Sequence, residues 1–179
     1  MKNSVIGVIV LSAILALGCS KMFYTASGGV RPKRKNFYFS NGQLSIETNS
    51  KIDTNFLYLN TIKNMYAGAG KSGNLYKYYR FYKNSRFQMS TSYIDQDDYP
   101  EFQNINTGYI GYYKVKNDTL LCEFFASTNG GEYIFMEGLV ENDMIILKKM
   151  YPRNNAYSNK KNDTLVKTAI KAIHLKPDW

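Results

Sequence analysis

Three pairs of turn-forming residues, each between two β-rich runs, constrain the fold of this chain more than any other feature. The pairs are Asn84-Ser85, Asn117-Asp118 and Asn142-Asp143. Asn and Asp tolerate the positive φ that a two-residue hairpin turn requires. No helical period is sustained after residue 57. The sequence therefore predicts antiparallel hairpins rather than helices.

A two-residue turn also determines which side chains lie opposite each other, so each register can be checked against polarity. The second turn gives an apolar face of three opposed pairs: Val115 with Leu120, Tyr113 with Cys122, and Gly111 with Phe124. The other face, which we expect to contact solvent, pairs Lys116 with Thr119, Lys114 with Leu121, and Tyr112 with Glu123. This agreement between register and polarity favours a sheet with one buried face.

The other two hairpins follow the same rule. The third turn pairs Val140 with Ile145, Gly138 with Leu147, and Ile134 with Tyr151 on one face, and it places Glu137 opposite Lys148 as a cross-strand ion pair on the other. The first turn pairs Tyr82 with Phe87 and Arg80 with Met89 on a face that includes Tyr78, and it leaves Lys83, Arg86 and Gln88 on the opposite face.

Two further strands are expected at residues 55–62 and 166–175. The total of about eight short strands predicts an all-β fold, an antiparallel up-and-down β-barrel, because closure removes exposed sheet edges. An open sandwich is the main alternative. We expect eight side chains to point into the barrel: Tyr113, Val115, Leu120, Cys122, Phe124, Ile134, Met136 and Val140.

The N-terminus has the three parts of a secretory leader: Lys2, an apolar stretch at residues 5–17, and Gly18 before Cys19. The stretch is too short for a membrane-spanning helix, which needs about 20 residues. Residues 15–19 resemble the lipobox of bacterial lipoproteins, which implies cleavage before Cys19 and acylation (palmitate) of its sulfur. The alternative is an ordinary secretory signal followed by a chance cysteine.

This resemblance implies a domain organisation and a location. We expect a helical signal peptide at residues 1–18, a lipidated, flexible and basic tether at 19–36, and the β-barrel domain at 37–179. Cys19 would then anchor the protein in a membrane of the bacterial cell envelope, because two or more acyl chains suffice for stable anchoring. Ser20, rather than Asp, follows this cysteine and favours the outer membrane.

The formal net charge of +9 suggests an anionic partner until it is divided along the chain. Residues 20–35 contain five cations and no acid, whereas the chain from Asn36 onward has 17 basic and 14 acidic residues. The domain is therefore nearly balanced, and we expect no nucleic-acid partner. The basic stretch is interpreted as a solvated linker, with contact to anionic lipid headgroups as the alternative.

The residue types that carry most enzyme chemistry are scarce. His174 is the single histidine, and Cys122 lies in an apolar run where a buried, unreactive thiol is expected. Two apparent motifs, the acidic group Asp95, Asp97, Asp98 and Glu101 and the tripeptide Gly70-Lys71-Ser72, lack the spacing of a calcium loop and of a phosphate-binding loop. We expect no enzyme, no catalytic residue, no metal and no cofactor, although paired-carboxylate hydrolysis stays open.

Four tracts also resemble the small lipocalin-like lipoproteins of Bacteroidota: residues 52–55, 78–84, 108–115 and 138–147. The resemblance is one of spacing and residue type, without a catalytic motif. It implies a lipocalin-like barrel that binds a small amphipathic or apolar ligand.

The expected ligand-binding residues are Tyr78, Arg80, Tyr82 and Tyr113. Arg80 has two interpretations: a structural guanidinium that packs across the barrel floor, as an arginine does in lipocalins, or a counter-charge to an acidic ligand. The alternative function is that of a structural or interaction lipoprotein. Its barrel would be filled by side chains, and its outer aromatic surface would bind an envelope protein or a glycan.

Overall fold

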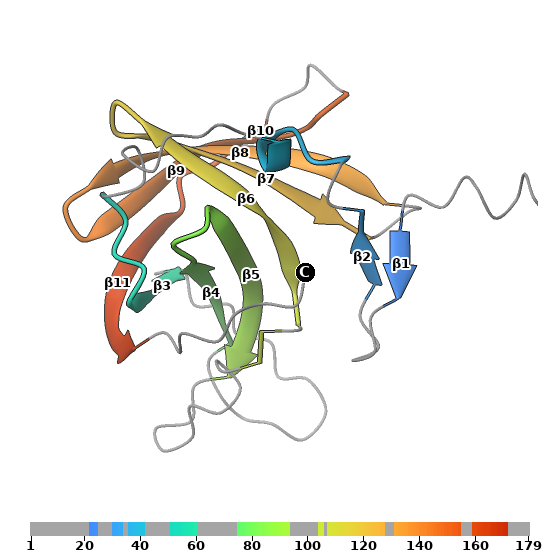
Figure 1. Cartoon of the computed structure of the whole chain (residues 1–179). Helices are drawn as coiled ribbons and strands as arrows, with labels where there is room; N and C mark the ends of the chain where they lie inside the picture. Colours follow the sequence, from blue (N-terminus) through green and yellow to red (C-terminus); the bar gives the residue numbers. More distant parts are fainter. Residues whose placement is uncertain are drawn as a thin grey trace, which may run out of the picture.

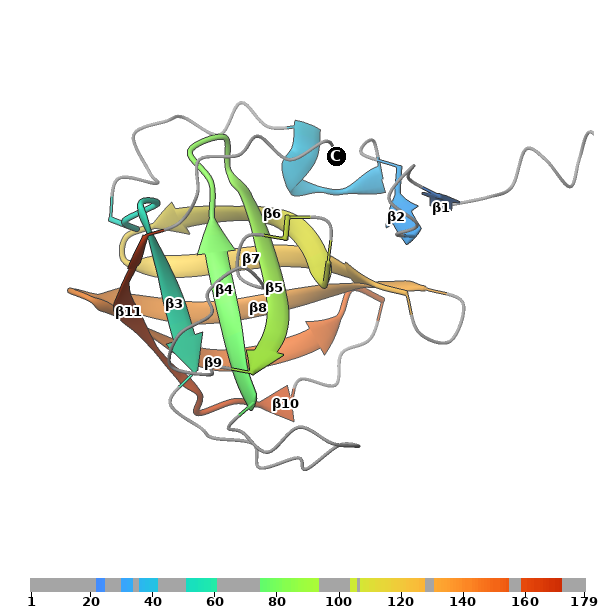
Figure 2. The ribbon, with the colours of Figure 1, turned by 90° about the horizontal axis from the view of Figure 1, so that it is seen from below.

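The computed structural model describes residues 22–24, 30–33, 36–41, 51–60, 75–93, 104–105, 107–127, 131–154 and 159–171. Its main body is a closed antiparallel up-and-down barrel of eight strands, which confirms the predicted fold class (Figures 1 and 2). The barrel strands are β3 (Phe56–Asn60), β4 (Leu75–Phe81), β5 (Arg86–Tyr93), β6 (Tyr109–Lys116), β7 (Thr119–Ala126), β8 (Glu132–Glu141), β9 (Met144–Pro152) and β11 (Thr164–Lys171).

The barrel closes because β9 pairs both with β8, which precedes it in the chain, and with β11, which follows beyond β10. One edge of β9 pairs with β8, and β11 pairs with β9 and β3. Every neighbour in the wall is therefore hydrogen-bonded, and the open-sandwich alternative is wrong. Three shorter elements lie outside this circuit: β10 (Asn159–Lys160), which pairs with β9, the antiparallel pair β1 (Met22–Tyr24) and β2 (Val30–Pro32), and the 3₁₀ turn η2 (Phe39–Asn41).

The barrel interior is packed with side chains from alternate positions of its strands. All eight side chains predicted to point inward belong to this core, with Ile134 partly buried. Aromatic rings meet edge to face inside it, with 4.9 Å between the ring centroids of Phe81 and Tyr113 and 6.3 Å between those of Phe87 and Phe124. Cys122 is a buried free thiol in this core, and burial raises its pKa well above the ordinary value.

The second hairpin has the predicted register at every pair. Both turn residues, Asn117 and Asp118, have positive φ, as a two-residue turn requires. Its outer face differs from the prediction, because Tyr112 and Glu123 are buried rather than exposed to solvent. Both side chains are covered by a segment from much earlier in the chain, described below.

The third hairpin begins as predicted and then shifts. Val140 lies opposite Ile145 and Gly138 opposite Leu147, but a β-bulge follows between Glu137 and Gly138. The extra residue in β9 places Lys149, rather than Lys148, opposite Glu137, with 3.7 Å between the ammonium nitrogen and the carboxylate. The predicted pairing of Ile134 with Tyr151 is wrong for the same reason, since a bulge opposes two residues to one.

The predicted register of the first hairpin is wrong by one residue. Phe81, not Tyr82, lies opposite Phe87, and Arg80 lies opposite Gln88. The loop has three residues and ends at Ser85 in the left-handed region, with φ of 62°. A three-residue loop changes the parity of the pairing and therefore reverses the face assignment of one strand relative to the other. Both strands keep their type. Phe87 and Met89 of β5 stay in the core, whereas the side chains of β4 lie on the side opposite to the predicted one.

The first and last strands of the barrel, β3 and β11, differ from the predicted strands in length or position. β3 covers Phe56–Asn60 within the expected residues 55–62, and β11 begins two residues before the expected 166–175. The predicted signal peptide, Cys19, the acidic group at residues 95–101, residues 70–72 and His174 lie outside the described residues. Within the predicted tether at 19–36, β1 and β2 form an antiparallel pair, and Arg31 is buried.

None of the helical segments in the described part of the chain is long and apolar enough to cross a membrane.

Replacing Phe124 by Ala should lower the free energy of unfolding by about 3 to 5 kcal/mol, because the ring is buried in the barrel and contacts Phe87 and Tyr109. Urea denaturation measures this loss. Met144→Ala, at an exposed position of β9, should change the free energy by less than about 0.5 kcal/mol. Similar small losses in both variants would contradict the assignment of Phe124 to a packed interior.

Candidate binding groove

A segment of residues 36–41, which ends in η2, lies against the outer face of the barrel wall near β6 and β7 (Figure 2). The ring of Phe37, only 2% exposed, inserts between Tyr112 of β6 and Tyr133 of β8. The ring centroids lie 5.0 and 5.1 Å from that of Phe37. This satellite aromatic cluster explains why Tyr112 is buried on a face that sequence alone assigns to solvent.

Glu123 forms the polar half of the same contact. Its side chain is 0% exposed, and Oε2 accepts a hydrogen bond of 3.0 Å from the backbone amide of Phe39. Oε1 accepts a charge-assisted bond of 3.1 Å from Nη1 of Arg153, which also donates to the carbonyl oxygen of Asn36 at 2.9 Å. Burial raises the pKa of Glu123, although the Phe39 amide and the Arg153 guanidinium act in the opposite direction.

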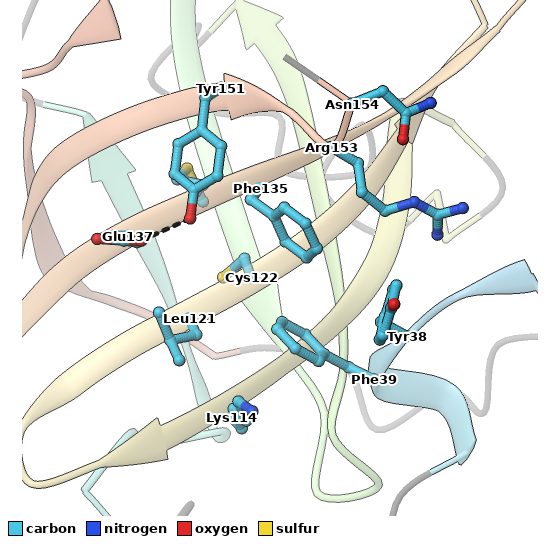
Figure 3. A pocket seen from close by; sticks show the side chains of 11 residues that line it. Tyr38, Phe39, Lys114, Leu121, Cys122, Phe135, Glu137, Tyr151, Arg153 and Asn154 are labelled. Atoms are coloured by element: carbon cyan, nitrogen blue, oxygen red, sulfur yellow. Dashed lines mark hydrogen bonds between the residues drawn. The ribbon is translucent and has the colours of Figure 1, made fainter. Parts of the chain in front are cut away.

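A groove of about 610 Å³ runs beside this docked segment across β6 to β9 (Figure 3). Its volume is within the usual range for small-ligand sites, about 300–1,000 Å³. Four aromatic residues line it: Tyr38 and Phe39 from the docked segment, Phe135 from β8 and Tyr151 from β9. Phe135 is central, with its ring centroid 5.7 Å from those of both Phe39 and Tyr151 and 6.5 Å from that of Tyr38.

Polar groups are placed between and beside these rings. The hydroxyl of Tyr151 donates to Oε1 of Glu137 at 2.6 Å. Burial and this hydrogen bond raise the pKa of Tyr151 to about 12, so its hydroxyl is a neutral donor at neutral pH. Nζ of Lys114 lies 4.5 Å from the ring centroid of Phe39, and the guanidinium of Arg153 lies 5.3 Å from that of Tyr38. Asn154 completes the lining.

The four residues predicted to bind ligand do not point to one side of the wall. Tyr113 points into the core, where its hydroxyl donates to the carbonyl of Tyr82 at 3.0 Å. Tyr78, Arg80 and Tyr82 alternate along the chain with the core residues Tyr79 and Phe81 and therefore lie on the outer side. The prediction that Arg80 shares a face with Phe87 and Met89 is wrong, because the three-residue loop pairs Arg80 with Gln88 on the outer side.

The outer cluster is itself buried. Arg80 is 1% exposed, and the guanidinium lowers the pKa of Tyr82, against the larger raising effect of burial. The Tyr82 hydroxyl donates to Oε1 of Gln88 at 3.2 Å. Nε2 of Gln88 in turn donates to the carbonyl oxygens of Asn104 and Thr107. Both interpretations of Arg80, the structural one and the ligand-binding one, stay predictions.

The groove residues are not among those predicted to bind a ligand. One local signal was the aromatic triplet at residues 37–39, directly at the expected start of the barrel domain. Phe135 and Glu137 alternate with core residues of β8, which marks them as outer-face positions.

No protein-family model, no curated protein and no solved structure matches this chain. The resemblance to lipocalin-like lipoproteins implies an eight-stranded antiparallel barrel, and the structure shows this barrel and no other part of the resemblance.

Replacing Phe37 by Ala should release the docked segment, because the ring supplies its main apolar contact with the wall. Hydrogen exchange at the amide of Phe39, which is bonded to Glu123, should accelerate by about tenfold or more. Tyr38→Ala provides the control, since Tyr38 is 71% exposed and should leave this exchange rate unchanged. Equal protection in the Phe37 variant and the native protein would contradict the docking role.

Glu123 should make stability depend on pH. Because its folded pKa is raised, the folded carboxyl holds its proton more tightly than the unfolded one, whose pKa is about 4.3. Its contribution to stability is complete below that value and is lost as pH rises through the raised pKa. The free energy of unfolding of the native protein should therefore fall relative to that of Glu123→Gln as pH rises from about 4.3. Urea titrations at a series of pH values measure the difference.

The matched control is Glu132→Gln, which neutralises an exposed carboxyl at the start of β8. This variant should retain the pH dependence of the native protein. If Glu123→Gln also retained the native pH dependence, burial would not be the dominant influence on the pKa of Glu123.

Proposed function

We propose that this protein is a non-catalytic binding module and that its ligand is a saccharide held in the outer groove. The observation that carries the proposal is the set of four aromatic rings around a groove of about 610 Å³ that also contains fixed polar groups. The barrel fold itself is compatible with ligand binding, because its hydrogen-bonded strands form a rigid scaffold that can position binding residues on either face.

The chemistry of the groove matches that of a sugar ring. A pyranose has apolar C–H faces that stack on aromatic rings and hydroxyls at its edge that both donate and accept hydrogen bonds. Phe135 and the exposed Tyr38 offer ring surface, whereas Asn154 and Arg153 offer edge donors and Glu137 an acceptor. A purely apolar ligand would cover the remaining hydrogen-bonding atoms of these groups without satisfying them, which is costly.

The outer groove is favoured over the lumen for two reasons. Large aromatic side chains, including Tyr113, Phe81 and Phe87, occupy the part of the interior that the structure describes. The predicted lumen residues Tyr78, Arg80 and Tyr82 lie on the outer side. The proposal therefore follows the interaction-protein alternative with a glycan partner, rather than a lipocalin-like module that encloses a small amphipathic or apolar ligand.

The proposal includes a location. A lipoprotein anchored through acylated Cys19, in the outer membrane of a bacterial envelope, would hold the groove close to surface glycans. The docked segment at residues 36–41 directly follows the predicted tether, so the groove would lie beside the anchored end of the domain.

Phe135→Ala should weaken saccharide binding at least about tenfold, since a stacked ring contributes about 0.5–1.5 kcal/mol beyond its buried area. A glycan array of mono- to tetrasaccharides identifies the ligand, and calorimetric titration then gives the affinities. Leu139→Ala is the matched control: it truncates a half-buried side chain on the same face of β8 that is not part of the groove lining. The control should bind normally.

Two results would overturn the proposal. One is that no saccharide on the array binds the native protein at millimolar concentration. The other is that Phe135→Ala and Leu139→Ala bind equally well.

A further inference from the structure

We infer that the saccharide bound in this groove carries a carboxylate and that Lys114 is the residue that pairs with it. The inference rests on the proposed function and specifies its ligand as an acidic sugar of the uronic-acid type. It is carried by the distribution of charge among the groove residues.

Lys114 is the cation of the groove without an anionic partner. Its strand position on β6 opposite Leu121 places it in the lining, and its ammonium lies over the Phe39 ring. Among the described residues it forms no ion pair and no hydrogen bond. In Figure 3 its side chain lies at the Phe39 end of the groove, away from Arg153.

The other charges of the groove are already matched. Nη1 of Arg153 donates to both Glu123 and the Asn36 carbonyl. Glu137 uses Oε1 to accept from Tyr151 and has Lys149 3.7 Å from Oε2. The carboxylates of Glu123 and Glu137 thus have Arg153 and Lys149 as partners, and one positive charge is left. That charge is on Lys114.

A ligand cation would be poorly placed here. The ring faces of Phe39 and Tyr38 that could attract it already have Lys114 and Arg153 over them. An anion has the opposite preference, because it pairs with the Lys114 ammonium while its apolar face stacks on Phe135 or Tyr151. Lys114 is only partly exposed, so a pair with it is screened less than a fully exposed surface pair.

A carboxylate could also belong to a fatty acid, but the groove favours a sugar acid. An acyl chain would cover Asn154 and the remaining hydrogen-bonding atoms of Glu137 and Arg153 without satisfying them. A uronic acid carries its carboxylate on the edge of a ring whose hydroxyls can satisfy those groups.

The test uses disaccharides of galacturonic, glucuronic and mannuronic acid, each with its methyl ester, which keeps the sugar and removes the charge. Calorimetric titration of the native protein should show at least one acid that binds about tenfold or more tightly than its ester. This preference should decrease with added salt. Lys114→Met should bind acid and ester equally, whereas Lys114→Arg should retain the preference for the acid.

Lys116→Met is the matched control. Lys116 lies two residues further along β6, on the same face, but is exposed and does not line the groove. This variant should behave like the native protein, and thermal unfolding of all three variants verifies that they are folded.

Each remaining outcome overturns a distinct claim. Equal binding of acids and esters by the native protein would overturn the carboxylate inference and leave saccharide binding intact. Failure of all acids and esters, together with a glycan array that shows no ligand, would overturn the proposed function as well. Binding of sodium laurate in preference to every uronic acid would assign the Lys114 site to a fatty acid and overturn the sugar acid.

Discussion

The buried carboxylate of Glu123 is the contact on which the outer face of this barrel depends. A fully buried carboxylate is costly unless it is paired and hydrogen-bonded. Here the partners are the amide of Phe39 and the guanidinium of Arg153, which come from segments far apart in the chain. The same contact brings Tyr38 and Phe39 against β8. Without it, the groove would lose one of its two aromatic walls.

The contact of Glu123 with Phe39 and Arg153 also shows which parts of the structure could be predicted from the sequence. The barrel was predictable because its hairpins are local: Asn117 and Asp118 determine the register of six residues on either side. The docked segment was not predictable in the same way, because Phe39 and Glu123 are 84 residues apart in the chain. A pattern of polar and apolar residues identifies a face that could contact solvent, but it does not reveal what covers that face.

The two register errors have a common physical origin. The side-chain period of a strand is two, so one added residue reverses every later assignment. Asn84-Ser85 resembles a two-residue turn, but the left-handed residue Ser85 is the third of a three-residue loop. The consequence was a wrong face for Arg80, the most specific of the predicted ligand-binding residues. In β9 the added residue is a bulge, for which no turn residue gives a local signal.

The bulge in β9 shows how such an irregularity can build a site. In the unbroken register Tyr151 would lie opposite Ile134 and point into the core. The bulge moves Tyr151 opposite Phe135 and therefore onto the outer face, where its hydroxyl reaches Glu137. It also places Lys149 opposite Glu137, which neutralises that carboxylate. Bulges recur next to functional sites because they redirect side chains without changing the fold.

The groove is thus made by two departures from an ideal barrel: a bulge that turns Tyr151 outward and a distant segment clamped by Glu123. An ideal eight-stranded barrel with alternating polarity would present a convex, polar outer face. Both departures have a local cost. The bulge interrupts the regular pairing of β9 with β8, and the docked segment buries the charge of Glu123. Violations of local rules of this kind concentrate where a protein binds something, and here they meet around Phe135.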